Sequence, residues 1–440
     1  MKVNNLKFNI VPKNKFKFFD VSRLKKIKAL NFYFKYLSKI QPIRFFFIKS
    51  YALYVKLFYS LNFFGREKYQ LIKLKEFVKN NALSASVLFK SSSVDYINPC
   101  VVNMDMIDLD KLIDKKQHFE NIFLTQIKDA KVLGSTSLIF KDNEAICHDL
   151  YDFELDSTSE ELHHIFNYST SGISIDLKNY NYSHIDEAAI FINALALNYA
   201  HWMTEILPRI AAFCKNSKYK NIPLIINHGL HKNIILSLEL IASGRNVIFL
   251  KTNESIDVKN LYVVSEAGYT SFEPRKNSIP QSSNGSFNLE ALNHVRNFFK
   301  SKVNRNKKWP KRIFLKRNSG YRNLTNSKEI EMLLRQKGFV VYEFEKVSLE
   351  DQIGLFSNAD YIVGPTGAHF ANILFSKSKA HIVILISNAI GSNFKYWPNI
   401  ASLFDIQVKY IIGHAKDLKS WNIHSDFNID PKLIKEAIND

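Results

Sequence analysis

From Asp186 onward, short apolar segments alternate with amphipathic segments long enough to form helices. This alternation predicts parallel strands joined by crossover helices, because two consecutive parallel strands need a long connection and a helix supplies it. The pattern favours an α/β fold with two units and a cleft between them. A Pro, Ser and Asn-rich stretch at residues 273–286 separates two groups of expected strands: AAIFIN, PLIIN, NVIFL and NLYVVS before it, and RIFLK, FVVYEF, DYIVG and HIVILIS after it.

Two further segments precede the α/β part. Residues 121–149 alternate in short runs, IFLTQI, AKVLG, TSLIF and EAICHD, which predicts a β-meander with turns between the runs. At 440 residues, the chain is long enough for two globular domains and an extension. We therefore expect an extension over residues 1–80, an N-terminal domain with the meander over 81–285, and a C-terminal domain over 286–440.

The positive charge of the chain is concentrated in the first 80 residues. They hold nineteen lysines and arginines but three acidic residues, a formal charge of +16 out of +19 for the whole chain. Apolar residues recur there every three to four positions among lysines, at Leu24, Ile27, Leu30, Phe34 and Leu37, which predicts a basic amphipathic helix. The Phe-rich stretch at residues 43–64 has no charge-free run approaching the ~20 residues that a membrane span requires.

Three interpretations of this basic helical extension remain open. It could lie on an anionic membrane surface, dock its aromatic face on the rest of the protein, or contact a nucleic acid. No recognisable nucleic-acid motif accompanies it, so we expect no nucleic-acid partner. The N-terminus has no apolar run behind its charge, and Cys100, Cys147 and Cys214 lack CxxC spacing. We therefore expect a cytoplasmic protein peripheral to the inner membrane.

The segment GPTGAHFANILF, residues 364–375, joins an expected strand to an expected helix through a glycine-rich turn. Unpaired N–H groups and the positive end of the helix dipole meet at the first turn of such a helix, where a phosphate is stabilised. An ordinary βα turn, with glycines for tightness, explains the same sequence.

A second segment, KRIFLKRNSGYR at residues 311–322, carries Lys316, Arg317 and Arg322 after another expected strand. Arginine presents paired donors that suit a diphosphate, although a solvated run of charges is the alternative. Both segments follow strands of one expected sheet. Ligands of open α/β sheets bind at the carboxyl ends of the strands, so the two turns are candidates for one anion site.

The segment HWMTEILPR, residues 201–209, spaces His201, Glu205 and Arg209 four apart, which places them along one face of a continuous helix. An imidazole and a carboxylate in contact share general-base work. The spacing also suits two metal ligands, but no third ligand is evident, so we expect no metal and no cofactor. In the alternative interpretation, Glu205 pairs with Arg209 and His201 caps the helix. Pro208 removes one helical donor and complicates the geometry.

Together, NYAHWMTEILPR, RIFLKRNSGYR with Asn326, and SLEDQIGLFSNADYIVGPTGAHFANILF resemble glycosyltransferase family 61 over roughly residues 120–390. Bacterial members of this family are often described as capsular polysaccharide biosynthesis proteins. The resemblance implies two Rossmann-like domains in the GT-B arrangement. It also implies transfer from a nucleotide sugar, with a UDP sugar favoured, generally with inversion and without a DxD metal site. The implied acceptor is a surface glycan such as capsule or lipopolysaccharide.

The resemblance also assigns roles to individual residues. His201 and Glu205 become catalytic candidates on the acceptor side, and Arg317 and Arg322 become contacts of the donor diphosphate. The donor pocket is implied at Gly364, Thr366, Gly367, Ala368, His369 and Asn372.

Two of these positions depart from the family, because many members carry His at the position of Thr366 and a small residue at that of His369. These departures make a catalytically inactive glycan-binding or nucleotide-binding protein one alternative function. The charge of +16 in residues 1–80 makes a membrane scaffold of a polysaccharide assembly complex the other. Gln352 and Phe356 lie in the helix before the last strand of the motif, where packing explains Phe356.

Overall fold

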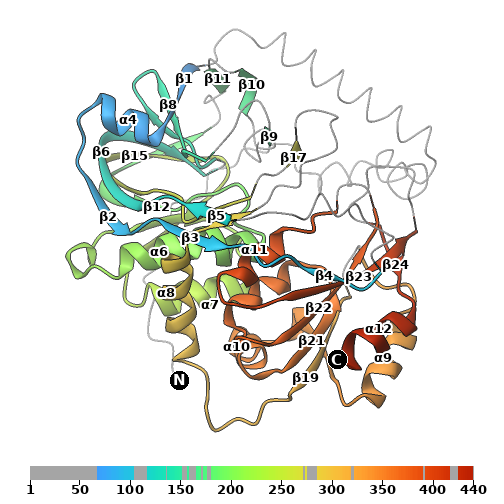
Figure 1. Cartoon of the computed structure of the whole chain (residues 1–440). Coiled ribbons are helices and arrows are strands. Elements are labelled where there is room, and N and C mark those ends of the chain that lie inside the picture. The colour runs from blue at the N-terminus through green and yellow to red at the C-terminus, as the bar shows by residue number, and fades with distance from the viewer. Residues whose placement is uncertain are drawn as a thin grey trace, which may run out of the picture.

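The computed structural model confirms an α/β protein built on two large sheets (Figure 1). It describes residues 67–103, 116–134, 136–150, 156–157, 165–169, 172–175, 180–270, 273–274, 285–318, 322–389, 392–416 and 425–439. The basic amphipathic helix expected over residues 24–37 and the Phe-rich stretch at 43–64 lie outside these ranges. No helix within them is long and apolar enough to cross a membrane.

The N-terminal unit is built on a mixed sheet whose described strands follow the order β10-β11-β1-β8-β7-β6-β15-β12-β13-β14, with β2 paired to β6. Four neighbouring strands are parallel and confirm the first predicted group: β12 (Asn181–Ile190), β13 (Leu224–Asn227), β14 (Val247–Leu250) and β15 (Glu254–Val264). Antiparallel neighbours confirm the meander: β6 (Ile122–Leu133), β7 (Ile139–Lys141) and β8 (Glu144–Cys147).

Two details predicted for this part of the chain are wrong. IFLTQI and AKVLG form the single strand β6, because Lys128 keeps its pairing with Asn260 of β15. At the turn expected between these two runs, Asp129 adopts a left-handed backbone conformation, with a φ of 51°, but the strand continues. Residues 67–73, expected within a helical extension, form the strand β1 (Glu67–Lys73), and the helix α4 (Leu74–Asn80) follows it. Tyr69 and Ile72 are buried in apolar clusters on opposite faces of β1, as in a strand inside a sheet.

Helices connect the parallel strands as predicted. After β12 comes one helical stretch in three parts, α5 (Tyr199–His201), the π-helical turn η5 (Trp202–Ile206) and α6 (Leu207–Cys214). Helix α7 (Lys232–Ile241) follows β13. The remaining described strands of this sheet are β2 (Ala85–Phe89), β10 (Ile165–Ser169) and β11 (Gly172–Ile175).

The C-terminal unit confirms the second predicted group of strands. Its sheet runs β20-β19-β21-β22-β23-β24, and the first five strands are parallel: β19 (Arg312–Lys316), β20 (Val340–Glu343), β21 (Tyr361–Pro365), β22 (His381–Ser387) and β23 (Val408–Ala415). Strand β19 lies between its two successors, β20 and β21, so the strand order reverses there. In doubly wound sheets a ligand binds outside the carboxyl ends of the strands at such a point.

Short strands and helices complete the C-terminal unit. Helix α10 occupies Leu349–Asn358 and carries Gln352 and Phe356, which the sequence placed in a helix before the last strand of the motif. The other elements are the antiparallel edge strand β24 (Phe427–Asn428), the 3₁₀ turns η7 (Phe344–Lys346) and η8 (Ala368–Phe375), and the helices α9 (Ser327–Gln336), α11 (Tyr396–Ser402) and α12 (Pro431–Asn439).

The two units pack closely on one another. Figure 1 shows helices between the sheets, and helix α8 (Leu289–Lys300) contacts both α6 and α10. One buried apolar cluster takes Phe191 and Ile210 from the first unit and Leu315 and Ile384 from the second. Strand β4 (Cys100–Val101), from the range expected in the N-terminal domain, pairs with β23 of the C-terminal sheet. The expected boundaries after residues 80 and 285 stay predictions.

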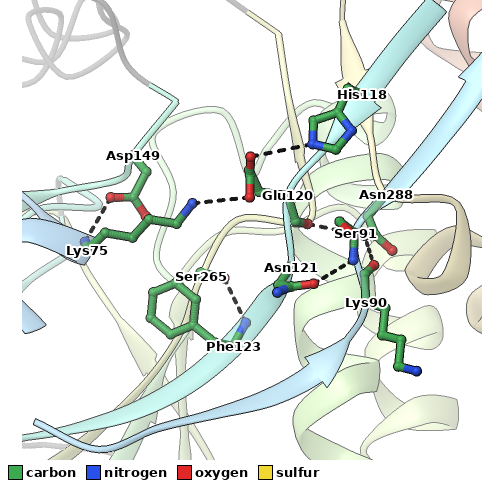
Figure 2. Close-up of polar contacts among 10 residues, drawn as sticks. All are labelled: Lys75, Lys90, Ser91, His118, Glu120, Asn121, Phe123, Asp149, Ser265 and Asn288. Carbon is green, nitrogen blue, oxygen red and sulfur yellow. Dashed lines mark hydrogen bonds and ion pairs between the residues drawn. The ribbon is translucent and has the colours of Figure 1, made fainter.

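Polar contacts fix the places where the chain passes between the units (Figure 2). Asn288 is fully buried, accepts a hydrogen bond from the Ala291 N–H at the start of α8, and donates one to the Lys90 carbonyl over 2.8 Å. The Ser91 N–H donates to Asn121 Oδ1 over 2.6 Å. The segments around residues 90, 121 and 288, each passing between the units, are therefore held together at one junction.

Candidate active site

The helical stretch after β12 changes its winding at the predicted catalytic residues. Asn198 begins it by accepting a hydrogen bond from the Ala200 N–H. Pro208 has no N–H to donate, and its ring would clash with the carbonyl four residues earlier in a regular α-helix. The helix widens into the π turn before it, where the Leu207 N–H bonds to the carbonyl of Trp202, five residues back. Such π turns occur often at functional sites.

His201 and Glu205 form a close pair in this stretch. His201 Nδ1 lies 2.8 Å from Glu205 Oε1, and the two side chains are 15% and 5% exposed. The alternative interpretation is wrong on both counts. Arg209 binds Glu266, with 3.0 Å between Nη1 and Oε1, and His201 lies inside the helix, which Asn198 caps. The His201 imidazole therefore pairs with the Glu205 carboxylate, while Arg209 pairs with Glu266.

Tyr396 reaches this pair from α11 of the C-terminal unit. Its ring centroid lies 6.4 Å from that of His201, and its hydroxyl lies 3.1 Å from Thr204 Oγ1. Burial, and then the nearby Glu205 carboxylate, raise the pKa of Tyr396 well above its ordinary value, so the phenol keeps its proton. Sequence reasoning missed this residue. In the sequence, Tyr396 stands out as part of the adjacent aromatic pair Tyr396–Trp397, but it belongs to no motif.

Arg317 and the glycine-rich turn meet at the carboxyl ends of β19 and β21, which are parallel neighbours. Arg317 Nη1 donates to the Thr366 carbonyl over 3.4 Å. A Cβ at Gly367 would lie 2.1 Å from the same nitrogen and 2.9 Å from Cε1 of His369. Only glycine leaves room for the guanidinium at this position, so the predicted arginine and the predicted turn do come together.

His369 adds an uncharged imidazole to this cluster. Burial, and then the Arg317 guanidinium, lower its pKa to about 3, and Arg322 acts in the same direction. Arg322 itself has a φ of 58°, a left-handed conformation that non-glycine residues rarely adopt. Nε2 of His369 is buried and makes no hydrogen bond within the described residues. A neutral ring nitrogen is thus left beside two arginines.

Other residues predicted for the donor pocket also serve packing. Gly364 lies within β21, where a Cβ would come 2.8 Å from Cβ of Leu315. Thr366 Oγ1 accepts a hydrogen bond from the Trp397 indole over 3.1 Å. Ala368 opens η8, which is a 3₁₀ helix where the sequence pattern predicted ordinary helical spacing.

Asn372 connects the two units. It is fully buried, and its Oδ1 accepts a hydrogen bond from the Tyr199 hydroxyl over 2.9 Å. Its amide donates to Gln352 Oε1 over 3.1 Å and to the His369 carbonyl over 2.9 Å. The amide of Gln352 in turn donates to the Phe344 and Val347 carbonyls. Both donors and one acceptor position of Asn372 are therefore occupied by protein partners.

The described residues contain no group of three or more His, Cys, Asp or Glu side chains that could hold a metal ion. The three cysteines are free thiols.

Comparison with known families gives a match over part of the chain. The model of the family described as Glycosyltransferase 61 matches residues 199–383. The match begins at Tyr199, runs through the His201–Glu205 pair and the glycine-rich turn, and ends in β22, a narrower range than the motifs suggested. No curated protein matches the chain. The match supports glycosyltransferase activity, with a sugar donor and an acceptor as its ligands. Residues 199–383 therefore match the glycosyltransferase family 61 that the motifs resemble.

Proposed function

We propose that this protein is an inverting glycosyltransferase that moves a sugar from a nucleoside diphosphate donor to a hydroxyl of a surface glycan. The resemblance favours a UDP sugar as donor and capsule or lipopolysaccharide as acceptor. One observation carries the proposal. The hydrogen bond from Tyr199 to Asn372 joins the helix of His201 and Glu205 to the turn beside Arg317. A candidate base and a candidate anion site, from different sheets, therefore adjoin each other.

The reaction in this proposal is a single displacement. The acceptor oxygen attacks the anomeric carbon from the face opposite the diphosphate, and its proton passes to the His201–Glu205 pair. The bond from the anomeric carbon to the diphosphate oxygen breaks, and the diphosphate leaves with the electron pair. Because the imidazole and carboxylate are 2.8 Å apart, a proton taken by one is stabilised by the other.

The donor side supplies charge stabilisation. Arg317, Arg322 and the N–H groups at the start of η8 would face the departing diphosphate, where fixed donors are most effective. His369, neutral because burial and Arg317 lower its pKa to about 3, would accept a hydrogen bond from a donor hydroxyl at Nε2. The Thr366 hydroxyl already accepts the Trp397 indole, so its role is to shape the pocket.

The arrangement of the parts belongs to the same proposal. The reversal of strand order at β19 supports a donor site on the C-terminal unit, with the acceptor on the N-terminal unit, as in the GT-B arrangement. The charge of +16 in residues 1–80 supports binding to an anionic membrane surface, which would place the enzyme at the cytoplasmic face of the inner membrane.

A panel of nucleotide sugars tests the activity. The full-length protein is mixed with each donor, and its melting temperature and the release of nucleoside diphosphate are both measured. We expect one class of donor to raise the melting temperature and to be consumed when a glycan acceptor is added. Stabilisation without any turnover would indicate an inactive binding protein. Neither effect with any donor would contradict the proposed function.

A further inference from the structure

The segment that carries His201 and Glu205 is hydrogen-bonded to the C-terminal unit near both of its ends. At the start, the Tyr199 hydroxyl donates to Asn372 Oδ1 over 2.9 Å. Further along, the Tyr396 hydroxyl lies 3.1 Å from Thr204 Oγ1. The Thr204 hydroxyl already donates to the Ala200 carbonyl over 2.8 Å, so the tyrosine is the donor in that contact.

The partners of these tyrosines are themselves held in place. Asn372 is anchored by Gln352 and by the His369 carbonyl, so its oxygen has a fixed direction. The Tyr396 ring is packed between Phe287 and Trp397, with ring centroids 5.8 Å and 4.5 Å away. Burial raises the pKa of both phenols, so both remain hydrogen-bond donors. Both contacts are therefore made to anchored partners, and both hydroxyls keep their protons across the working pH range.

The helix between these contacts needs such support. A π turn replaces the regular bonding four residues back, so an unbroken α-helical ladder does not set the rotation of this segment. The positions of His201 and Glu205 relative to the donor turn then depend on bonds from outside the helix. A misplacement of about 1 Å at a reacting group costs on the order of a hundredfold in rate.

We propose that Tyr199 and Tyr396 are positioning residues that hold the His201–Glu205 pair in register with the donor turn. This inference rests on the proposed function. Neither hydroxyl acts on the reacting atoms. Tyr199 acts through Asn372, whose amide binds the carbonyl of His369 in the donor turn. Tyr396 acts through Thr204, which lies between His201 and Glu205 in the chain.

The test uses the full-length protein with Tyr199→Phe and Tyr396→Phe, each of which removes one hydroxyl and keeps the ring. The matched control is Tyr410→Phe, because the Tyr410 hydroxyl is buried in β23 and makes no hydrogen bond within the described residues. We expect kcat to fall roughly tenfold or more in the two site variants, with the donor KM changed less than about twofold. The pH profile of kcat should also move in these variants and stay unchanged in the control.

A merely structural role predicts a different result. If the site variants melt at a lower temperature but keep the kcat and the pH profile of the wild type, the proposal is overturned.

A second readout needs no turnover. The imidazole NMR signals of His201, assigned with His201→Gln, should move in both site variants and stay in place in Tyr410→Phe. Unmoved signals overturn the positioning role by themselves. A wild-type protein that transfers no sugar while these signals do move would contradict the proposed function and leave the positioning role supported.

Discussion

The guanidinium of Arg317 occupies the space that a side chain at Gly367 would fill, with 2.1 Å between Nη1 and the position of the missing Cβ. Gly367 has an extended backbone, with a φ of 176°, so alanine brings no backbone strain there. The closer of the two displaced groups is the end of the flexible Arg317 side chain, and the His369 ring, with Cε1 2.9 Å away, must shift slightly, so Gly367→Ala should push Arg317 out of the turn.

We expect Gly367→Ala to weaken the binding of the nucleoside diphosphate by about tenfold or more, because one charge-assisted contact is lost. Calorimetric titration of the diphosphate into the folded variant measures this. Arg335→Ala is the control, since Arg335 is an exposed arginine of the same unit that pairs with Glu331. An unchanged dissociation constant for Gly367→Ala would remove Arg317 from the donor site.

The neutral state of His369 predicts a pH dependence of stability. The folded imidazole takes up a proton only near pH 3, whereas the unfolded one does so near 6.5. Between these values the unfolded chain binds more protons, so stability is lost as pH falls below 6.5, by at most about 1.4 kcal/mol per pH unit. In urea unfolding at pH 7, 6 and 5, His369→Gln should lose less stability than the wild type. The exposed His118→Gln variant should behave as the wild type does, and equal slopes in all three proteins would contradict a buried neutral His369.

Arg209 should contribute to stability and leave the chemistry untouched. Its guanidinium binds the nearly buried Glu266 and the Val264 carbonyl. Arg209→Met removes the cation from a buried pair, so we expect the free energy of unfolding to fall by about 3 kcal/mol. Chemical denaturation measures this change. A variant of normal stability that has lost turnover would instead place Arg209 in the reaction, as a partner of Glu205.

The basic N-terminal segment should bind membranes independently of the enzyme body. The deletion for this test ends at residue 66. A deletion to residue 80 would remove strand β1, which pairs with β8 and β11 in the sheet. Without residues 1–66, the protein should stop sedimenting with anionic liposomes and still transfer sugar to a soluble acceptor. High salt should release the full-length protein in the same way. Unchanged sedimentation after the deletion would contradict membrane binding by this segment.

Much of the fold was predictable because it depends on local periodicity. The parallel strands and helix α10 lie where alternating apolar segments predicted them, since a buried strand or an amphipathic helix leaves a direct pattern in the sequence. The pairing of β4 with β23 was not predictable, because a two-residue strand has no period. The strand β1 was also missed, because Lys68 and Lys73 continue the basic composition of the segment before it.

The candidate site was also predictable in part, where it depends on local spacing. The spacing of His201 and Glu205 predicted their contact, and the place of both turns at the carboxyl ends of strands in one sheet predicted that Arg317 would meet the turn at Gly367. Tyr396 lies far along the chain and reaches Thr204 only through tertiary packing, which no local pattern records. Pro208 predicted a break in the regular helix. It did not predict that the helix would widen into a π turn at the catalytic candidates.

The most direct test of the central claim is the turnover number of Glu205→Gln. This change keeps the shape of a side chain that is 5% exposed and removes its charge. Glu239→Gln, in helix α7 of the same unit, is the matched control. We expect Glu205→Gln to fold, to bind the donor with wild-type affinity, and to transfer sugar about a hundredfold to ten-thousandfold more slowly, the usual contribution of a general base. Wild-type turnover by the folded Glu205→Gln protein would contradict the account.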